Sequence, residues 1–202
     1  MSTVSDEVKA VAAAAVADEV KLGDLVDLLG ESSRSKRQKA AAALGQVAAT
    51  NPDLLAPHAN AIIDALNCPE AQTRWECLEI LTKLVPLEAR TCEKALPGAE
   101  TALFDEESGF VRLAAMRFLC AWGKTTENRS ERCWPLIDEG IQCYHGDIEF
   151  NDMIAAVTDF AGGKLSVHVK EALVARMTFD ATSGKGPIRR KAQAIIDVVE
   201  GK

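Results

Sequence analysis

An arginine followed by an apolar stripe recurs along the 202-residue chain at nearly constant intervals. Four stripes begin three residues after Arg37, Arg74, Arg112 and Arg189, which are called the repeat arginines below. In a fifth copy, Phe150 stands at the arginine position. The steps between the five positions are 37, 38, 38 and 39 residues. Because each stripe has helical spacing, a repeat of this length predicts a solenoid whose units pack on their neighbours.

A second apolar segment precedes each stripe and is separated from it by a short turn, so each repeat is predicted to be a pair of helices. Ser5 is a suitable N-cap for a further helix at the start of the chain. The sequence therefore predicts an all-α single domain over residues 1–202, with a capping helix over 5–16. The five expected helix pairs cover about residues 18–49, 53–85, 90–123, 129–161 and 165–200. Pro97 predicts that the first helix of the third pair either bends or begins late.

Composition limits the classes of partner. The formal net charge of −7 gives no general attraction to nucleic acid or to an anionic membrane, and we expect neither as a partner. The first residues show no apolar segment behind a basic start, and six cysteines without a secretory signal are expected to be reduced. These features predict a cytoplasmic protein without a membrane span.

The pattern of an apolar helix, a short turn, Val-Arg and an Ala/Leu-rich helix resembles the HEAT repeat. It is similar in particular to the HEAT-like form common in bacteria, which includes bilin-lyase proteins. Residues 25–41, 104–119 and 187–194 carry the resemblance best. It implies a right-handed α-solenoid of about five HEAT-like helix pairs, with the second helices lining the concave surface.

The resemblance also implies a ladder, in which an acid in each turn binds the repeat arginine seven residues later. Asp105 and Arg112 have this spacing, and Asn67 stands in the acid position before Arg74. The positions seven residues before Arg37 and Arg189 hold no acid. We therefore expect an incomplete ladder of Arg37, Asn67, Arg74, Asp105, Arg112 and Arg189, with stability arising mainly from apolar packing.

Candidate partner contacts lie on the second helices, beside the core stripe. Positions one and five residues after the repeat arginines include Trp75, Glu79, Leu113 and Arg117. If this side is concave, an exposed Trp and Leu beside an Arg would form a binding hot spot. The alternative is that Trp75 packs on the next unit. The predicted function is a non-catalytic scaffold that binds a protein or peptide of unknown identity, and the oligomeric state stays open.

Two other functions of HEAT-like proteins remain as alternatives, namely DNA glycosylases and bilin lyases or isomerases. A glycosylase would need a basic groove and a carboxylate beside an aromatic pair, and the repeat name alone supports a bilin enzyme. Cys133, Cys143 and His145 match no zinc-site spacing. We therefore predict no catalytic residues, no cofactor and no metal. Acidic residues in the middle of the chain form either a solvated surface or a surface that selects a basic partner.

Overall fold

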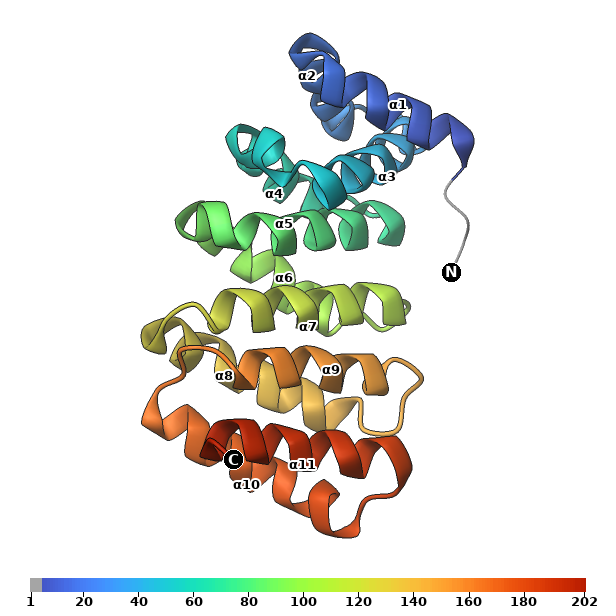
Figure 1. Cartoon of the computed structure of the whole chain (residues 1–202). Coiled ribbons are helices and arrows are strands. Elements are labelled where there is room, and N and C mark those ends of the chain that lie inside the picture. Colours follow the sequence, from blue (N-terminus) through green and yellow to red (C-terminus); the bar gives the residue numbers. More distant parts are fainter. Residues whose placement is uncertain (1–4) are drawn as a thin grey trace. The chain divides into compact units, whose positions relative to one another are not determined.

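The structure is a computed structural model that describes residues 5–202, and every regular element within that range is helical (Figure 1). The contacts divide the chain into two compact units. Unit 1 ends at Ala102 and unit 2 begins at Leu103, inside the third predicted helix pair. Each unit is described by itself.

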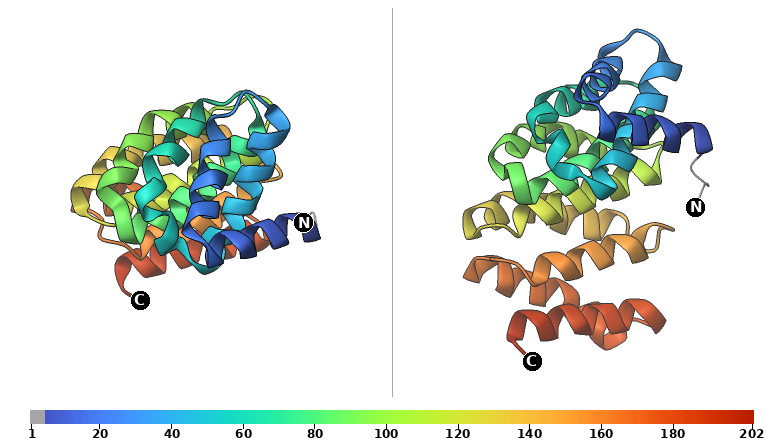
Figure 2. Two further views of the ribbon diagram at one scale, coloured as in Figure 1. Left: turned by 90° about the horizontal axis from the view of Figure 1, so that it is seen from above. Right: turned by 45° about the horizontal axis from the view of Figure 1, so that its top comes forward.

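Unit 1 begins with the predicted capping helix. This helix, α1 (Asp6–Ala17), starts where the Ser5 hydroxyl accepts a hydrogen bond from the backbone N–H of Val8 at 3.3 Å. The first helix pair consists of α2 (Glu19–Asp27), extended by the 3₁₀ turn η1 (Leu28–Gly30), and α3 (Arg34–Thr50). The N-cap of α2 is Asp18, whose carboxylate accepts hydrogen bonds from two backbone N–H groups in the first turn of that helix. α1 packs against α3 (Figure 2).

The first helix of the second pair is interrupted, although the sequence predicted one helix from residue 53 to 66. The chain forms η2 (Pro52–His58), α4 (Ala59–Asp64) and η3 (Ala65–Asn67). Pro57 lies inside η2, where it cannot donate a backbone hydrogen bond. The second helix of this pair is α5 (Ala71–Cys92).

Near its end α5 is kinked. Glu88 has non-helical dihedral angles of φ −130° and ψ 39°, two residues after Pro86. The chain then continues through η4 (Glu93–Ala95) into α6 (Leu96–Leu103). Pro97 is the second residue of α6, so of the two predicted possibilities the late start is the one observed.

Unit 2 consists of α-helices that no 3₁₀ segment interrupts. They are α7 (Gly109–Gly123), α8 (Glu127–Cys143), α9 (Phe150–Ala161), α10 (Val167–Ser183) and α11 (Gly186–Glu200). Ser108, Thr126 and Ser166 each accept a backbone hydrogen bond as N-caps of α7, α8 and α10. Helix α9 begins at the fifth repeat position, Phe150. The other second helices begin three residues before their repeat arginine, so α9 is almost one turn shorter at its start.

The apolar stripes form the core of each unit. In unit 1, α5 buries Cys77, Leu78, Ile80, Leu81 and Leu84. In unit 2, Trp122 of α7 is completely buried, at a position that continues the apolar stripe after Arg112. Beside it, Gly123 lets α7 approach its neighbours closely, because an added Cβ would lie 3.0 Å from both Cys133 and Phe160.

Candidate partner-binding sites

Arg37, the first of the two repeat arginines in unit 1, binds a glutamate from the following repeat. The Arg37 Nε donates to Glu70 at 3.2 Å, a second guanidinium nitrogen also pairs with Glu70, and the third donates to the backbone carbonyl of Glu31 at 2.5 Å. Glu70 is the N-cap residue of α5, and its carboxylate is almost completely buried. The hydrogen bond from Arg37 holds the pKa of Glu70 below its usual range.

Unit 2 repeats this arrangement around Arg112. Its Nε donates to Glu149 at 2.7 Å, and another guanidinium nitrogen donates to the backbone carbonyl of Asp105 at 2.9 Å. The guanidinium also lies 4.9 Å from the centre of the Tyr144 ring. Glu149 is the N-cap residue of α9, as Glu70 is of α5. The arginine therefore joins its own turn to the start of the next second helix.

The acid partners of these two arginines differ from the sequence expectation. The hydrogen bond between Arg112 and Asp105 uses the backbone carbonyl, and the carboxylate comes from Glu149, 37 residues later. Arg37, for which no acid was expected, has Glu70. The sequence does contain the feature that would have predicted these pairs, namely a glutamate directly before the second helix of the following repeat.

Two of the other ladder positions, Asn67 and Arg189, have different contacts. The Asn67 side-chain amide donates to the backbone carbonyl of Asp64 at 3.1 Å. Arg189, the last repeat arginine, donates through Nε to the backbone carbonyl of Ala181 at 3.1 Å. Within residues 5–202, no carboxylate binds Arg189.

On α5, the predicted contact residues Trp75 and Glu79 are half-buried. The neighbouring Glu76 packs over Gly45 of α3, where an added Cβ would lie 2.7 Å from the carboxylate oxygen. Burial raises the pKa of Glu76, although a hydrogen bond from Trp75 opposes this shift. Trp75 therefore helps to hold a desolvated carboxyl group, a role that the sequence analysis missed.

On α7, the structure corrects one predicted contact. Leu113 is only 8% exposed, so it is a packed side chain and cannot serve as an exposed anchor. It is buried because a helix in such an array packs on more than one side. Arg117, one turn further along α7, is half-buried.

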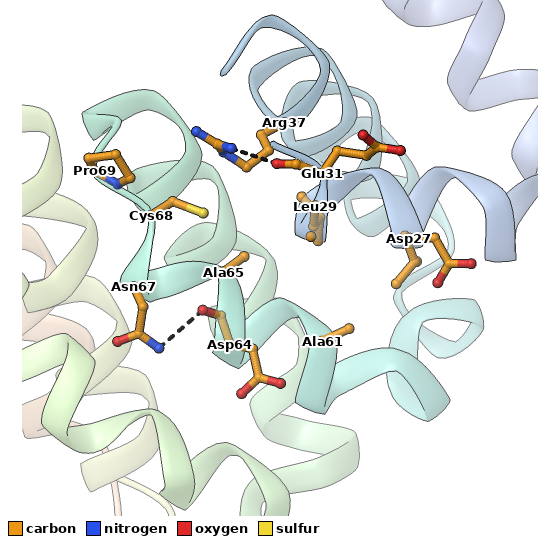
Figure 3. Close-up of a pocket in the computed structure, with 12 residues that line it drawn as sticks. Asp27, Leu29, Glu31, Arg37, Ala61, Asp64, Ala65, Asn67, Cys68 and Pro69 are labelled. Carbon is orange, nitrogen blue, oxygen red and sulfur yellow. Dashed lines mark hydrogen bonds between the residues drawn. The ribbon is translucent and has the colours of Figure 1, made fainter. Parts of the chain in front are cut away.

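A cleft in unit 1 lies between the turns of the first two repeats (Figure 3). Its volume is about 420 Å³, which lies within the range of about 300–1,000 Å³ typical of small-ligand sites. This unit-1 cleft has apolar walls and polar groups, and it is lined by Val26, Asp27, Leu29, Gly30, Glu31, Arg37, Ala61, Asp64, Ala65, Asn67, Cys68 and Pro69.

The charge of the unit-1 cleft is negative. Asp27 and Asp64 come from different helices, α2 and α4, and neither carboxylate forms an ion pair with any residue between 5 and 202. The third acid, Glu31, lies 3.7 Å from the exposed Lys36 amine. Arg37 is the positive residue in the lining, and Glu70 already neutralises it. The cleft therefore combines an apolar surface with unneutralised negative charge.

The three residues considered as metal ligands in the sequence have different surroundings. Cys133 is buried in α8, and burial raises the pKa of its thiol to about 12. Cys143 is exposed, whereas His145 lies 2.9 Å from the buried Asp180 carboxylate. The part of the chain that the structure describes holds no group of three or more His, Cys, Asp or Glu side chains arranged for a metal. None of its helices has the length and apolar character needed to cross a membrane.

Solved structures provide the informative comparisons. No protein-family model and no curated protein matches this sequence. An archaeal HEAT-like repeats protein from Thermococcus onnurineus NA1 aligns over 98% of this chain and 94% of its own, with 16% identity and a TM-score of 0.58. The chain has a HEAT/armadillo-like helical-repeat fold.

Two engineered proteins share this helical-repeat fold with higher TM-scores. One is described only as an engineered protein, with a TM-score of 0.74, 14% identity, and 96% of this chain and 84% of that chain covered. The other is a designed armadillo repeat protein in complex with the peptide (KR)4. It has a TM-score of 0.73 and 13% identity over 95% of this chain and 91% of its own. At these identities the likeness establishes the fold and leaves the function open.

Proposed function

We propose that this protein is a non-catalytic helical-repeat module that binds a lysine- and arginine-rich segment of another protein. The observation that carries the proposal is the unit-1 cleft, where Asp27 and Asp64 provide unneutralised carboxylates beside apolar walls. A lysine or arginine side chain has matching chemistry, because its aliphatic stem packs on apolar surface while its charged end meets a carboxylate.

The charge of the whole chain agrees with this partner class. A net charge of −7 attracts basic segments and speeds their diffusional encounter at low ionic strength. The fold also agrees, since a designed armadillo protein of similar fold was solved with the peptide (KR)4. That complex describes the designed protein, and it serves here as a reason to test alternating Lys–Arg peptides.

The α5 surface is proposed as a second contact region in unit 1. Trp75 and Glu79 lie one turn apart on α5, and a half-buried Trp offers a large, rigid contact area. Arg117 is kept as a separate candidate on unit 2. Leu113 is removed from the proposed contacts because it is buried.

Fluorescence anisotropy with a labelled (KR)4 peptide tests the proposal. Loss of two exposed charge contacts, each worth up to about 1 kcal/mol, predicts that Asp27→Asn/Asp64→Asn weakens binding by about tenfold. The matched control is Asp24→Asn/Asp53→Asn, which removes the same charge from exposed positions outside the cleft and should change binding by less than about twofold.

Equal weakening in the two double variants would show that only net charge attracts the peptide, and would exclude the cleft as the binding site. Absence of (KR)4 binding to the wild type would reject the proposed partner class. Trp75→Ala is measured in the same assay, and an unchanged affinity would remove the α5 surface from the proposal.

A further inference from the structure

One carboxyl group of unit 1 is partly withdrawn from water although no cation neutralises it. Glu76 of α5 is half-buried, and burial raises the pKa of its side chain. Its side-chain hydrogen-bond partner within residues 5–202 is the indole N–H of Trp75, which donates but carries no charge. Residues 40–50 of α3, the helix over which Glu76 packs, contain no charged side chain. Glu76 is therefore a desolvated acid without a counter-ion in the described chain.

The space for this carboxyl group depends on a glycine. Gly45 lies inside α3, where a glycine weakens a helix relative to alanine. A Cβ on Gly45 would lie 2.7 Å from the Oε2 atom of Glu76 and 3.8 Å from its Cδ atom. The missing side chain thus lets the carboxylate lie against α3. Gly45, the Glu76 carboxylate and the Trp75 indole are called the α3–α5 niche below.

We propose that the α3–α5 niche binds the guanidinium group of an arginine in the basic segment of the partner protein. This inference rests on the proposed function, because it names the site of one side chain of that segment. A guanidinium is more weakly hydrated than an ammonium and can donate two parallel hydrogen bonds to one carboxylate. The Trp75 ring beside the carboxylate adds an aromatic surface on which a guanidinium can stack.

The niche costs stability in a protein without a cationic ligand. An ionised carboxylate is disfavoured where burial removes its water, unless an opposite charge takes the place of that water. A bound guanidinium supplies the charge, and its attraction to Glu76 is stronger than its attraction to a fully hydrated surface carboxylate. Binding of a cation therefore explains together why the chain keeps a glycine inside α3 and an acid without a counter-ion opposite it.

Carboxyl-detected NMR with butylguanidinium chloride tests the niche directly. The probe is a single guanidinium group, so the test does not depend on binding of (KR)4 to the unit-1 cleft. We expect the probe to move the ionisation of Glu76 to lower pH, because a nearby positive charge favours the carboxylate. Sodium chloride at the same concentration is the control for ionic strength, and the Glu76 signal is assigned from its absence in Glu76→Gln.

The other titratable groups coupled to Glu76 are Glu79 and Cys77, both on α5. The Glu79 carboxyl signal is followed in the same spectra. Burial holds the pKa of the Cys77 thiol above its usual range, so this group stays neutral throughout a titration from acid to neutral pH.

Two variants make the test specific. Gly45→Ala places a Cβ in the niche and should displace the flexible end of Glu76 towards solvent. The effect of butylguanidinium on Glu76 should then fall to that of sodium chloride, while circular dichroism shows that the helices are intact. Glu19→Gln removes a carboxylate from an exposed position on α2 and should leave the effect on Glu76 unchanged.

Equal effects of butylguanidinium and sodium chloride on Glu76 would overturn the proposal, as would an effect that survives in Gly45→Ala. Binding of (KR)4 gives a second readout, in which Glu76→Gln should weaken the affinity about threefold and Glu19→Gln should not. If (KR)4 binds while butylguanidinium leaves Glu76 unaffected, the niche is rejected and the proposed function stands. If butylguanidinium acts on Glu76 while (KR)4 does not bind, the niche is supported and the proposed function is rejected.

Discussion

Replacement of Glu149 by alanine should destabilise unit 2 by about 2–3 kcal/mol. Removing one partner of a fully buried ion pair costs about 3–5 kcal/mol, because the other charge is left uncompensated. The Arg112 and Glu149 side chains are 14% and 11% exposed, so most of that loss applies. The expected loss of stability is smaller than 3–5 kcal/mol because the Asp147 carboxylate, 3.8 Å away, and the Tyr144 ring remain beside the Arg112 guanidinium. Glu149 makes no side-chain capping hydrogen bond, so the loss is specific to the pair.

Urea unfolding followed by circular dichroism measures this effect in wild type, Glu149→Ala, Arg112→Ala and the double variant. A loss of 2–3 kcal/mol should lower the urea midpoint of Glu149→Ala by about 1 M. The double-mutant cycle should give a coupling energy of at least about 1 kcal/mol. Asp147→Ala is the matched control, because this carboxylate is 48% exposed and should contribute less than about 1 kcal/mol. If the two single losses are additive, or if Glu149→Ala is no more damaging than Asp147→Ala, the pair does not stabilise unit 2 as argued.

Two further predictions concern close packing and buried charge. Gly163→Ala should destabilise the protein by about 1–3 kcal/mol, because the new Cβ would lie 2.7 Å from the backbone oxygen of Lys124. Gly162→Ala is the control. A Cβ there would have its nearest neighbour at 3.7 Å, so this variant should change the urea midpoint little. Equal midpoints for these two variants would contradict the close approach at residue 163. Glu76→Gln should raise stability at pH 7.5 and have no effect near pH 3.5. Burial raises the folded-state pKa of Glu76 above its unfolded-state value. The protonated carboxyl group therefore favours the folded state over the ionised group, and this stabilisation is fully present below the unfolded pKa and is lost as pH rises through the folded pKa. Urea midpoints at the two pH values check this prediction, with the exposed Glu171→Gln as control, and a variant that is no more stable at pH 7.5 would contradict it.

The sequence predicted the helical repeats well because their signal is apolar periodicity. The stripe after Arg74 and the core position of Trp122 follow from 3.6-residue spacing alone. Local interruptions were harder to predict. The 3₁₀ segments around Pro57 and the kink at Glu88 depend on how the chain packs near its prolines, and periodicity does not encode that.

The candidate sites were only partly predictable, since they depend on contacts between repeats. The predicted ladder paired each arginine with an acid of the same repeat, whereas Glu70 and Glu149 each bind the arginine of the preceding repeat. Leu113 illustrates a second difficulty, because a helix that packs on several sides has no single stripe that marks its exposed face. The unit-1 cleft is formed by two turns that are separate in the sequence, so no local motif could have indicated it.

The position of the two glutamates also has an evolutionary consequence. Each arginine–glutamate pair is divided between consecutive repeats, with the arginine near the start of one second helix and the glutamate at the N-cap of the next. Duplication or deletion of one whole repeat would therefore preserve a matched junction wherever both elements are retained. Insertions inside the first helices would also leave the pair intact, provided that the glutamate stays directly before its helix. Repeat number and loop length can thus vary in such a chain while the same electrostatic joint is reused.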